Sequence, residues 1–231
     1  MPKLSQLAIL LIMILTTTAC TSFSDGCPDG EIEWMDVVKV NDIKYLHDFV
    51  EEPGGFTAEK GKTIGDVSYM MAENACSNHK MENGDAAFLS EGTDLFEVEG
   101  YPASLMITDG NRIFIVEENN AANKVEELYP VQGKVKNVLF RSTNDDAIIH
   151  TFSEESKNEY LKEWLSLDVY EPEKFAKVDT TEEERVFIGI ELDNGIIFRV
   201  TYWSDKNFFS DGTKGSEELQ KFIKEELAKI K

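Results

Sequence analysis

Cys76-Ser77-Asn78-His79 has half of the ligand spacing of a zinc site. A complete site needs further donors, and these would have to come from Cys27, His47 or His150. A disulfide between Cys27 and Cys76 would consume two of the candidate ligands. We therefore expect one packed or bridged cysteine beside a surface histidine, and no metal site.

Gly61-Lys62-Thr63 has the ending of a phosphate-binding loop, which holds phosphate with backbone amides and a lysine. That loop requires a glycine five positions before Gly61, where this chain has Phe56. No apolar strand precedes the segment either. We expect Lys62 and Thr63 in a surface turn before a strand, with no nucleotide bound there.

Residues for hydrolysis do not form a recognisable pattern. The chain has no Gly-x-Ser-x-Gly, and the positions of His47, His79 and His150 are typical of surface side chains. Asp and Glu total 44, so a carboxylate pair chosen from sequence means nothing without geometry. Asp205 to Asp211 lacks the central glycine and final glutamate of a calcium loop. We predict no catalytic residue and no cofactor.

Two aromatic pairs lie close together in sequence. Tyr202 and Trp203 end a predicted strand, and Phe208 and Phe209 follow in a polar loop. On one surface the four rings would form a binding patch for a peptide or a wall glycan. The alternative is that they pack in the core beneath the last helix.

The residues before Cys20 predict export and lipidation. Lys3 gives a positive start, Leu7–Leu15 is an unbroken apolar run, and small residues follow, as in a signal peptide. Ala19-Cys20 resembles the bacterial lipobox, in which a cysteine receives a diacylglyceryl group; Thr17 departs from it, because leucine is usual there. Two acyl chains on one residue anchor stably. We expect a signal peptide over 1–19 and a protein held by membrane lipid through Cys20, outside the cytoplasm; plain secretion is the alternative.

The chain has three cysteines, Cys20, Cys27 and Cys76, and an odd number in an exported protein leaves one to explain. If lipid takes Cys20, the other two form an even pair that can oxidise outside the cytoplasm. Such a bridge could stabilise the fold by about 4 kcal/mol in the chain-entropy model. The alternative is two unbridged thiols.

A net charge of −21 with 42% hydrophobic residues indicates a folded, strongly acidic protein. Its surface repels nucleic acid and anionic lipid, so we expect no nucleic-acid partner. It would attract a basic protein or a cationic envelope component. The alternative is that the charge only maintains solubility.

The first half of the chain has short strands and frequent turns. Residues 20–31 form a polar tether that begins with the lipidated cysteine, and residues 32–118 form a β-rich unit. Expected strands are 38–40, 43–46, 64–71, 93–98, 104–108 and 112–116. A small barrel or a curled antiparallel sheet fits this unit.

The second half combines strands with helices. A connector over 119–134, with a short helix or turn near 123–128, leads into a unit over 135–231. We expect a strand at 135–141, a hairpin over 185–203, and helices that begin after Ser153 and Ser216. The order β-α-β-β-α predicts an antiparallel sheet with helices on one face. The fold class is therefore α+β.

Several short motifs resemble a group of uncharacterised lipoproteins from Gram-positive bacilli. They are Val38–Tyr45, Asn83–Ala86, Phe88-Leu89, Gly92-Thr93, Phe96–Val98, Gly100-Tyr101, and Asn194-Gly195 through Tyr202-Trp203. The resemblance covers most of the chain after the signal. It implies a Gram-positive membrane anchor facing the cell wall, and it supplies no catalytic residue.

Three functions remain open at the level of sequence. The favoured one is a non-enzymatic, lipid-anchored binding, sensing or scaffold module. The second is a carboxylate-dependent hydrolase of the cell wall or of a small substrate, for which a deep pocket with converging acids would be evidence. The third is an acidic inhibitor or immunity-type protein for a basic partner.

Overall fold

The computed structural model describes residues 32–48, 50–54, 56, 58–169 and 184–230. Residues 33–75 and 80–231 group into one unit, which carries every helix and strand named below. Cys20, Cys27 and the predicted signal peptide lie outside the described residues. No helix in the described part of the chain is long and apolar enough to cross a membrane.

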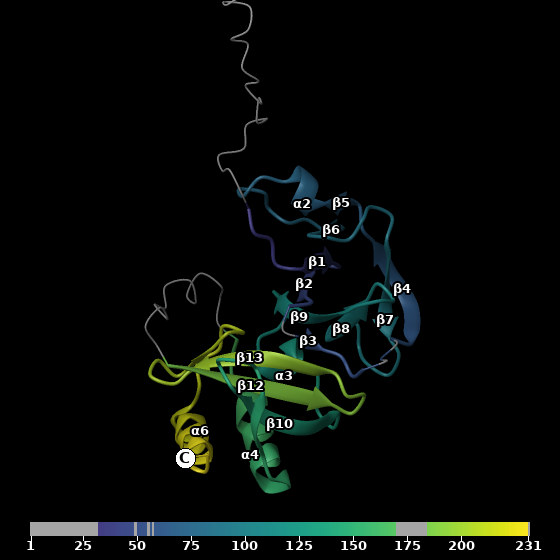
Figure 1. Ribbon diagram of the computed structural model, residues 1–231. Helices are drawn as coiled ribbons and strands as arrows, with labels where there is room; N and C mark the ends of the chain where they lie inside the picture. The colour runs from purple at the N-terminus through teal and green to yellow at the C-terminus, as the bar shows by residue number, and fades with distance from the viewer. Residues whose placement is uncertain (1–31, 49, 55, 57, 170–183, 231) are drawn as a thin grey trace, which may run out of the picture. The chain divides into compact units, whose positions relative to one another are not determined.

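The first sheet has eight strands in the spatial order β4-β7-β8-β9-β2-β1-β6-β5, and it curls into a half-barrel (Figure 1). Neighbouring strands are antiparallel, except that β5 and β6 are parallel. Helix α2 (Met71–Asn74) follows β5. The strands are β1 (Val37–Val40), β2 (Ile43–Leu46), β4 (Lys60–Asp66), β5 (Tyr69–Met70), β6 (Asp85–Ala86), β7 (Asp94–Val98), β8 (Met106–Thr108) and β9 (Ile113–Asn119).

The turns of this sheet follow from residues that tolerate positive φ. Asn41 and Asp42, between β1 and β2, have φ of 53° and 62°, as a two-residue hairpin of this type requires. In the β8–β9 turn the Asp109 Oδ1 atom accepts hydrogen bonds from the amides of Asn111 and Arg112, at 2.7 Å each. Gly110, which lies between Asp109 and Asn111, has a φ of 99°.

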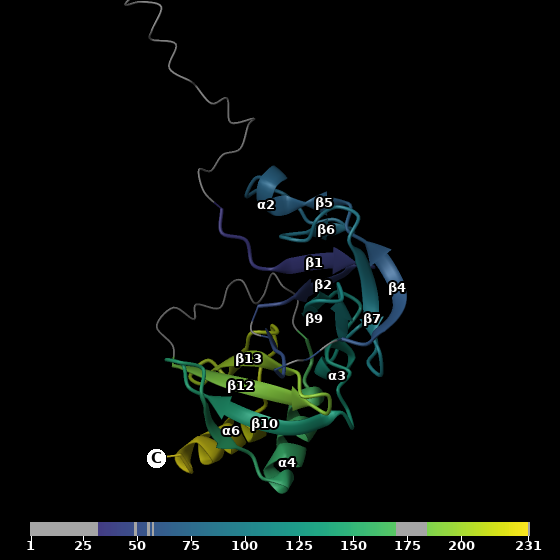
Figure 2. The same cartoon turned by 45° about the vertical axis from the view of Figure 1, so that its right-hand side comes forward.

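The second sheet is antiparallel, in the order β11-β10-β12-β13-β14, with β3 also paired to β13. Both ribbon views show helices α4 and α6 along one side of β10, β12 and β13 (Figures 1 and 2). The strands are β3 (Val50–Glu51), β10 (Val135–Arg141), β11 (Ile148–Thr151), β12 (Arg185–Leu192), β13 (Ile197–Trp203) and β14 (Phe208–Phe209), and the helices are α3 (Val125–Leu128), α4 (Glu154–Leu165) and α6 (Glu217–Ala228).

Both long helices start where the sequence predicts. Ser153 Oγ accepts from the Ser156 amide at 3.1 Å, and Ser216 Oγ accepts from the Leu219 amide at 3.0 Å. These caps satisfy amides that the first turn leaves without a partner. Helix α4 buries Tyr160 and Trp164. One hydrophobic core includes residues of both sheets and both helices.

The structure confirms the α+β class, the curled first sheet and the antiparallel second sheet with helices. The strand expected over 64–71 is wrong in its bounds: β4 runs over Lys60–Asp66 and β5 is a separate pair of residues. Lys62 and Thr63 therefore lie in a strand and not in a turn before one. The division of the chain at 119–134 stays a prediction, although one core contains residues from both sides of it.

Candidate functional site

A cavity of about 150 Å³ lies where β2, β3 and β9 meet β13 and the segment after β14. Since one water molecule in the liquid takes up about 30 Å³, the cavity has the volume of about five waters. Its lining mixes carboxylates, hydroxyls, one guanidinium and apolar side chains. The lining residues are Met35, Leu46, Asp48, Val50, Ile115, Val116, Glu117, Tyr129, Phe198, Arg199, Thr201, Ser210 and Asp211.

The pairing of β13 explains why a cavity forms here. On one edge of this strand, β3 pairs with residues 197–198 and β14 pairs with residues 202–203. Between these two ladders, the Ser210 side chain accepts from the Thr201 amide at 2.9 Å, and the Ser210 amide donates to the Thr201 carbonyl at 2.8 Å. The edge between β3 and β14 is therefore filled by one loop residue, and a space remains beside it.

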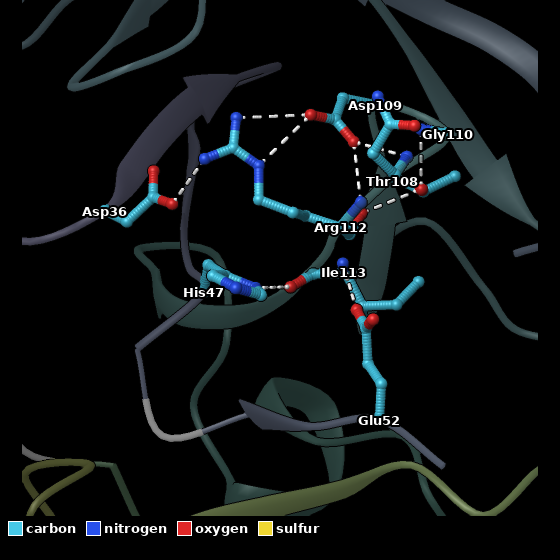
Figure 3. A network of polar contacts seen from close by, with 9 residues as sticks. Asp36, His47, Glu52, Thr108, Asp109, Gly110, Arg112 and Ile113 are labelled. Atoms are coloured by element: carbon cyan, nitrogen blue, oxygen red, sulfur yellow. Dashed lines mark hydrogen bonds and ion pairs between the residues drawn. The ribbon is translucent and has the colours of Figure 1, made fainter. Parts of the chain in front are cut away.

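A charged network fixes one wall. Figure 3 shows the Arg112 guanidinium between the carboxylates of Asp36 and Asp109. Arg112 Nη1 donates to Asp36 Oδ2 at 2.7 Å, and Nε and Nη2 each lie 3.2 Å from Asp109 Oδ2. Burial raises the pKa of the Asp36 carboxyl, while the Arg112 charge and hydrogen bond oppose that rise. The Asp36 amide donates to Asp48 Oδ2 at 2.9 Å, which positions a lining carboxylate.

His47 has a structural part in this wall. Its Nδ1 atom lies 2.8 Å from the Ile113 carbonyl oxygen, which can only accept, so Nδ1 carries the proton (Figure 3). The Ile113 amide in turn donates to Glu52 Oε1 at 2.8 Å. These contacts tie the residues on either side of β3 to the start of β9.

Another part of the lining holds a carboxylate among aromatic rings. Asp211 Oδ1 accepts from the Thr213 amide at 2.9 Å and from its hydroxyl at 2.6 Å, and Asp211 Oδ2 accepts from Trp164 Nε1 at 3.3 Å. Burial raises the pKa of Asp211 against the effect of these hydrogen bonds. The Tyr129 ring stacks between Trp164 and Phe198, with centroids at 5.3 Å and 5.4 Å.

The cationic groups near the cavity are already paired. Lys44 Nζ lies 2.8 Å from Glu117 Oε2. Arg199 Nη1 lies 3.5 Å from Asp146 Oδ1, and its guanidinium stacks on Phe187 at 4.0 Å. By contrast, the described partners of Asp48 and Asp211 are uncharged donors. The lining therefore has an excess of negative charge.

The predicted aromatic patch divides between two faces of the sheet. Tyr202 and Phe209 are buried with ring centroids 4.6 Å apart, so neither can belong to an exposed patch. Trp203 and Phe208 are half-buried on the other face, opposite one another in the β13–β14 ladder. The ladder explains the division, because successive side chains of a strand alternate between faces.

The remaining predicted positions do not converge on the cavity. Cys76 is disulfide-bonded, and its partner lies outside the described residues, so the pairing with Cys27 stays a prediction. His150 lies in β11, where Nε2 is 3.1 Å from Glu226 Oε2. The described residues contain no group of three or more histidines, cysteines or acids that could hold a metal ion.

Sequence reasoning missed the site. In the sequence, Asp211 belongs to a segment that matches a calcium loop only in part. Asp48, Glu117 and Arg199 belong to no recognised motif. The Asp109-Gly110-Asn111 turn was a usable signal, because it fixes Arg112, but the partner Asp36 is 76 positions away. No family model, no curated protein and no solved structure matches this chain.

Proposed function

We propose that this chain is a lipid-anchored, extracytoplasmic binding module without catalytic activity, whose ligand site is the cavity between the two sheets. The anchor rests on the signal-like segment and Cys20. The binding site rests on one observation: three carboxylates line the cavity, of which Asp48 and Asp211 accept hydrogen bonds and Glu117 forms an ion pair with Lys44.

Fixed carboxylates suit the binding of a ligand that donates hydrogen bonds. Here Asp48 accepts a backbone amide, Glu117 faces Lys44, and Asp211 accepts three hydrogen bonds. Such contacts hold the charges in place before a ligand arrives, which reduces the ordering cost of binding. A carboxylate has about four acceptor positions, so each can still accept from a ligand.

Saturation-transfer NMR tests this proposal on the full chain, with a panel of small amines, alcohols and carboxylic acids. We expect saturable binding of at least one class. Thr201→Phe adds a ring at a lining position and should abolish that binding, while Thr63→Phe on β4 adds the same ring away from the cavity and should not. Absence of binding by every class, or binding that survives Thr201→Phe, would contradict the proposal.

A second candidate is a carboxylate-dependent hydrolase, and one observation favours it. Asp211 has a raised pKa and shares a cavity with Asp48 and Glu117. A carboxyl group with a raised pKa that shares a cavity with a second carboxyl group is the arrangement that glycoside hydrolysis uses. Incubation of the full chain with cell-wall fragments would test it. Turnover that Asp211→Asn abolishes and Asp205→Asn preserves would replace the binding account with this one.

A further inference from the structure

We infer that the cavity takes a small organic ammonium ion of about six non-hydrogen atoms, with the ammonium near Glu117 and Asp211 and the hydrocarbon part against the apolar wall. This inference rests on the proposed function, because it names the ligand class of the same site.

Size gives the first restriction. A cavity of about 150 Å³ in another protein is known to admit benzene, which has six carbon atoms. This cavity has about the same volume, so it fits a short amine or one side chain and is smaller than the usual pocket for a drug-sized ligand. A folded peptide or a glycan chain could contribute only one group to it.

Charge gives the second restriction. Asp48, Glu117 and Asp211 outnumber the one lining cation, Arg199. Arg199 Nη1 lies 3.5 Å from Asp146 Oδ1, so part of its charge is already offset within the protein. A ligand carboxylate or phosphate would add negative charge to an acidic site, which is unfavourable where solvent screening is weak. An ammonium ion would reduce the excess.

Glu117 and Asp211 act on one point of the cavity. The pKa of the Tyr129 hydroxyl lies well above its usual value, chiefly because of burial, and the Asp211 and Glu117 charges raise it further. The Tyr129 hydroxyl therefore stays neutral near both carboxylates. Glu117 Oε2 is buried and has no hydrogen bond of ordinary geometry among the described residues, although the Lys44 ammonium is close. An ammonium N–H could supply that bond.

The rest of the lining suits a hydrocarbon. Met35, Leu46, Val50, Ile115 and Val116 are apolar and face the same space. Met35 is also 45% exposed, so this part of the cavity lining reaches the protein surface. A ligand with one charged end and one apolar end can contact both the carboxylates and the apolar side chains. A bare metal ion would leave the apolar side chains in contact with water.

Three probes with one carbon skeleton isolate the charge: 3-methylbutylammonium, 3-methyl-1-butanol and 3-methylbutanoate. Isothermal titration of each into the full chain gives the dissociation constants. We expect the ammonium ion to bind at least about tenfold more tightly than the alcohol, which corresponds to about 1.4 kcal/mol. The carboxylate should bind least. Equal or tighter binding of the alcohol or the carboxylate would overturn the inference.

Two neighbouring variants locate the charge effect. Glu117→Gln removes a lining carboxylate, and Glu118→Gln makes the same change one residue later, at a position outside the cavity lining. We expect Glu117→Gln to weaken the binding of the ammonium ion roughly three- to tenfold and to leave the affinity for the alcohol unchanged. Glu118→Gln should change neither. An equal effect of the two variants would attribute the preference to overall charge and contradict the site.

The outcomes separate this inference from the proposed function. Binding of the alcohol or the carboxylate that Thr201→Phe abolishes would keep the ligand site and reject the ammonium ion. No binding of any probe would reject both. Nα-acetyl-lysine methylamide tests the source of the ammonium group: tighter binding of this compound indicates a lysine side chain presented by a partner, and weaker binding indicates a free amine.

Discussion

Arg112 Nη1 donates to Asp36 Oδ2 at 2.7 Å, across 76 positions of the chain. This bond joins the segment before β1 to the turn between β8 and β9. Because the Asp36 amide also positions Asp48, the same bond supports one wall of the cavity. Stability and ligand binding should therefore depend on it together.

Arg112→Met should lower the free energy of unfolding at pH 7 by about 2 kcal/mol. The loss leaves Asp36 without its cation, but it is smaller than for a fully buried pair because the Arg112 side chain is 30% exposed. Urea denaturation of the full chain measures it, with exposed Lys62→Met as the control. The deficit should shrink as the pH falls through the folded pKa of Asp36, which burial raises above the ordinary 3.8, because a protonated carboxyl no longer pairs with Arg112. A constant deficit across pH would contradict the ion-pair explanation.

Glu226→Gln tests the contact between α6, α4 and β11. The carboxylate is 3% exposed and accepts from Ser156 Oγ at 2.7 Å, from Lys229 and from His150. Burial raises the pKa of Glu226, but these partners together bring it below its ordinary value of 4.5. The stability this group contributes is present above pH 4.5 and lost as the pH falls through the lower, folded pKa.

We expect Glu226→Gln to cost about 1–3 kcal/mol at pH 7 and to cost less in acid. Glu225→Gln is the matched control, because Glu225 is exposed and pairs across the helix surface with Lys221. Thermal unfolding at pH 7 and pH 3 measures both variants. Similar losses of stability in Glu225→Gln and Glu226→Gln would show that the buried contacts of Glu226 do not stabilise the fold.

Asp211→Asn should change the pH dependence of stability in the opposite direction. A carboxyl whose pKa is raised on folding binds its proton more tightly in the folded state. Its contribution is therefore complete below pH 3.8 and is lost as the pH rises through the folded pKa. The variant lacks this loss, so its stability relative to the wild type should increase from about pH 4 upward. If the relative stability stays constant or decreases as the pH rises from about 4, Asp211 is not a buried carboxyl with a raised pKa.

Cys20→Ser should abolish lipid attachment. Without the thiol no diacylglyceryl group can be added, and a protein that depends on it should leave the membrane fraction or remain as an uncut precursor. Cell fractionation and the electrophoretic mobility of the chain measure this, with Thr17→Leu as a control that brings the segment closer to the lipobox. A Cys20→Ser protein that is still anchored and processed like the wild type would refute the lipoprotein account.

Local signals made much of the fold predictable. Asn41-Asp42 and Asp109-Gly110 specify tight turns with positive φ, and Ser153 and Ser216 cap their helices. In each case, residues within a few positions of one another determine the structure. The curled form of the first sheet and the order β10, α4, β12, β13, α6 in the second follow from these signals.

Short or exposed strands were not predictable. β3 has two residues, too few for a pattern, and pairs with a strand about 150 positions later. β11 exposes Ile148 at 54% and Ile149 at 47%, so its apolar residues do not alternate between a buried and an open face. Tertiary pairing with β10 creates this strand.

The candidate site was not predictable for the same reason. Asp48, Glu117 and Asp211 come from three separate parts of the chain, and none has a neighbour in sequence that marks its role. Their common position depends on β3 joining the second sheet beside β13. Among 44 acidic residues, only geometry distinguishes these three.

Chemical-shift mapping of the full chain with 3-methylbutylammonium tests the central claim most directly. The account predicts saturable shifts that are largest at the amides of Glu117, Thr201 and Asp211, and that disappear in Thr201→Phe. Shifts spread over the exposed acids of α4 and α6, or no shifts at all, would contradict an ammonium site between the two sheets.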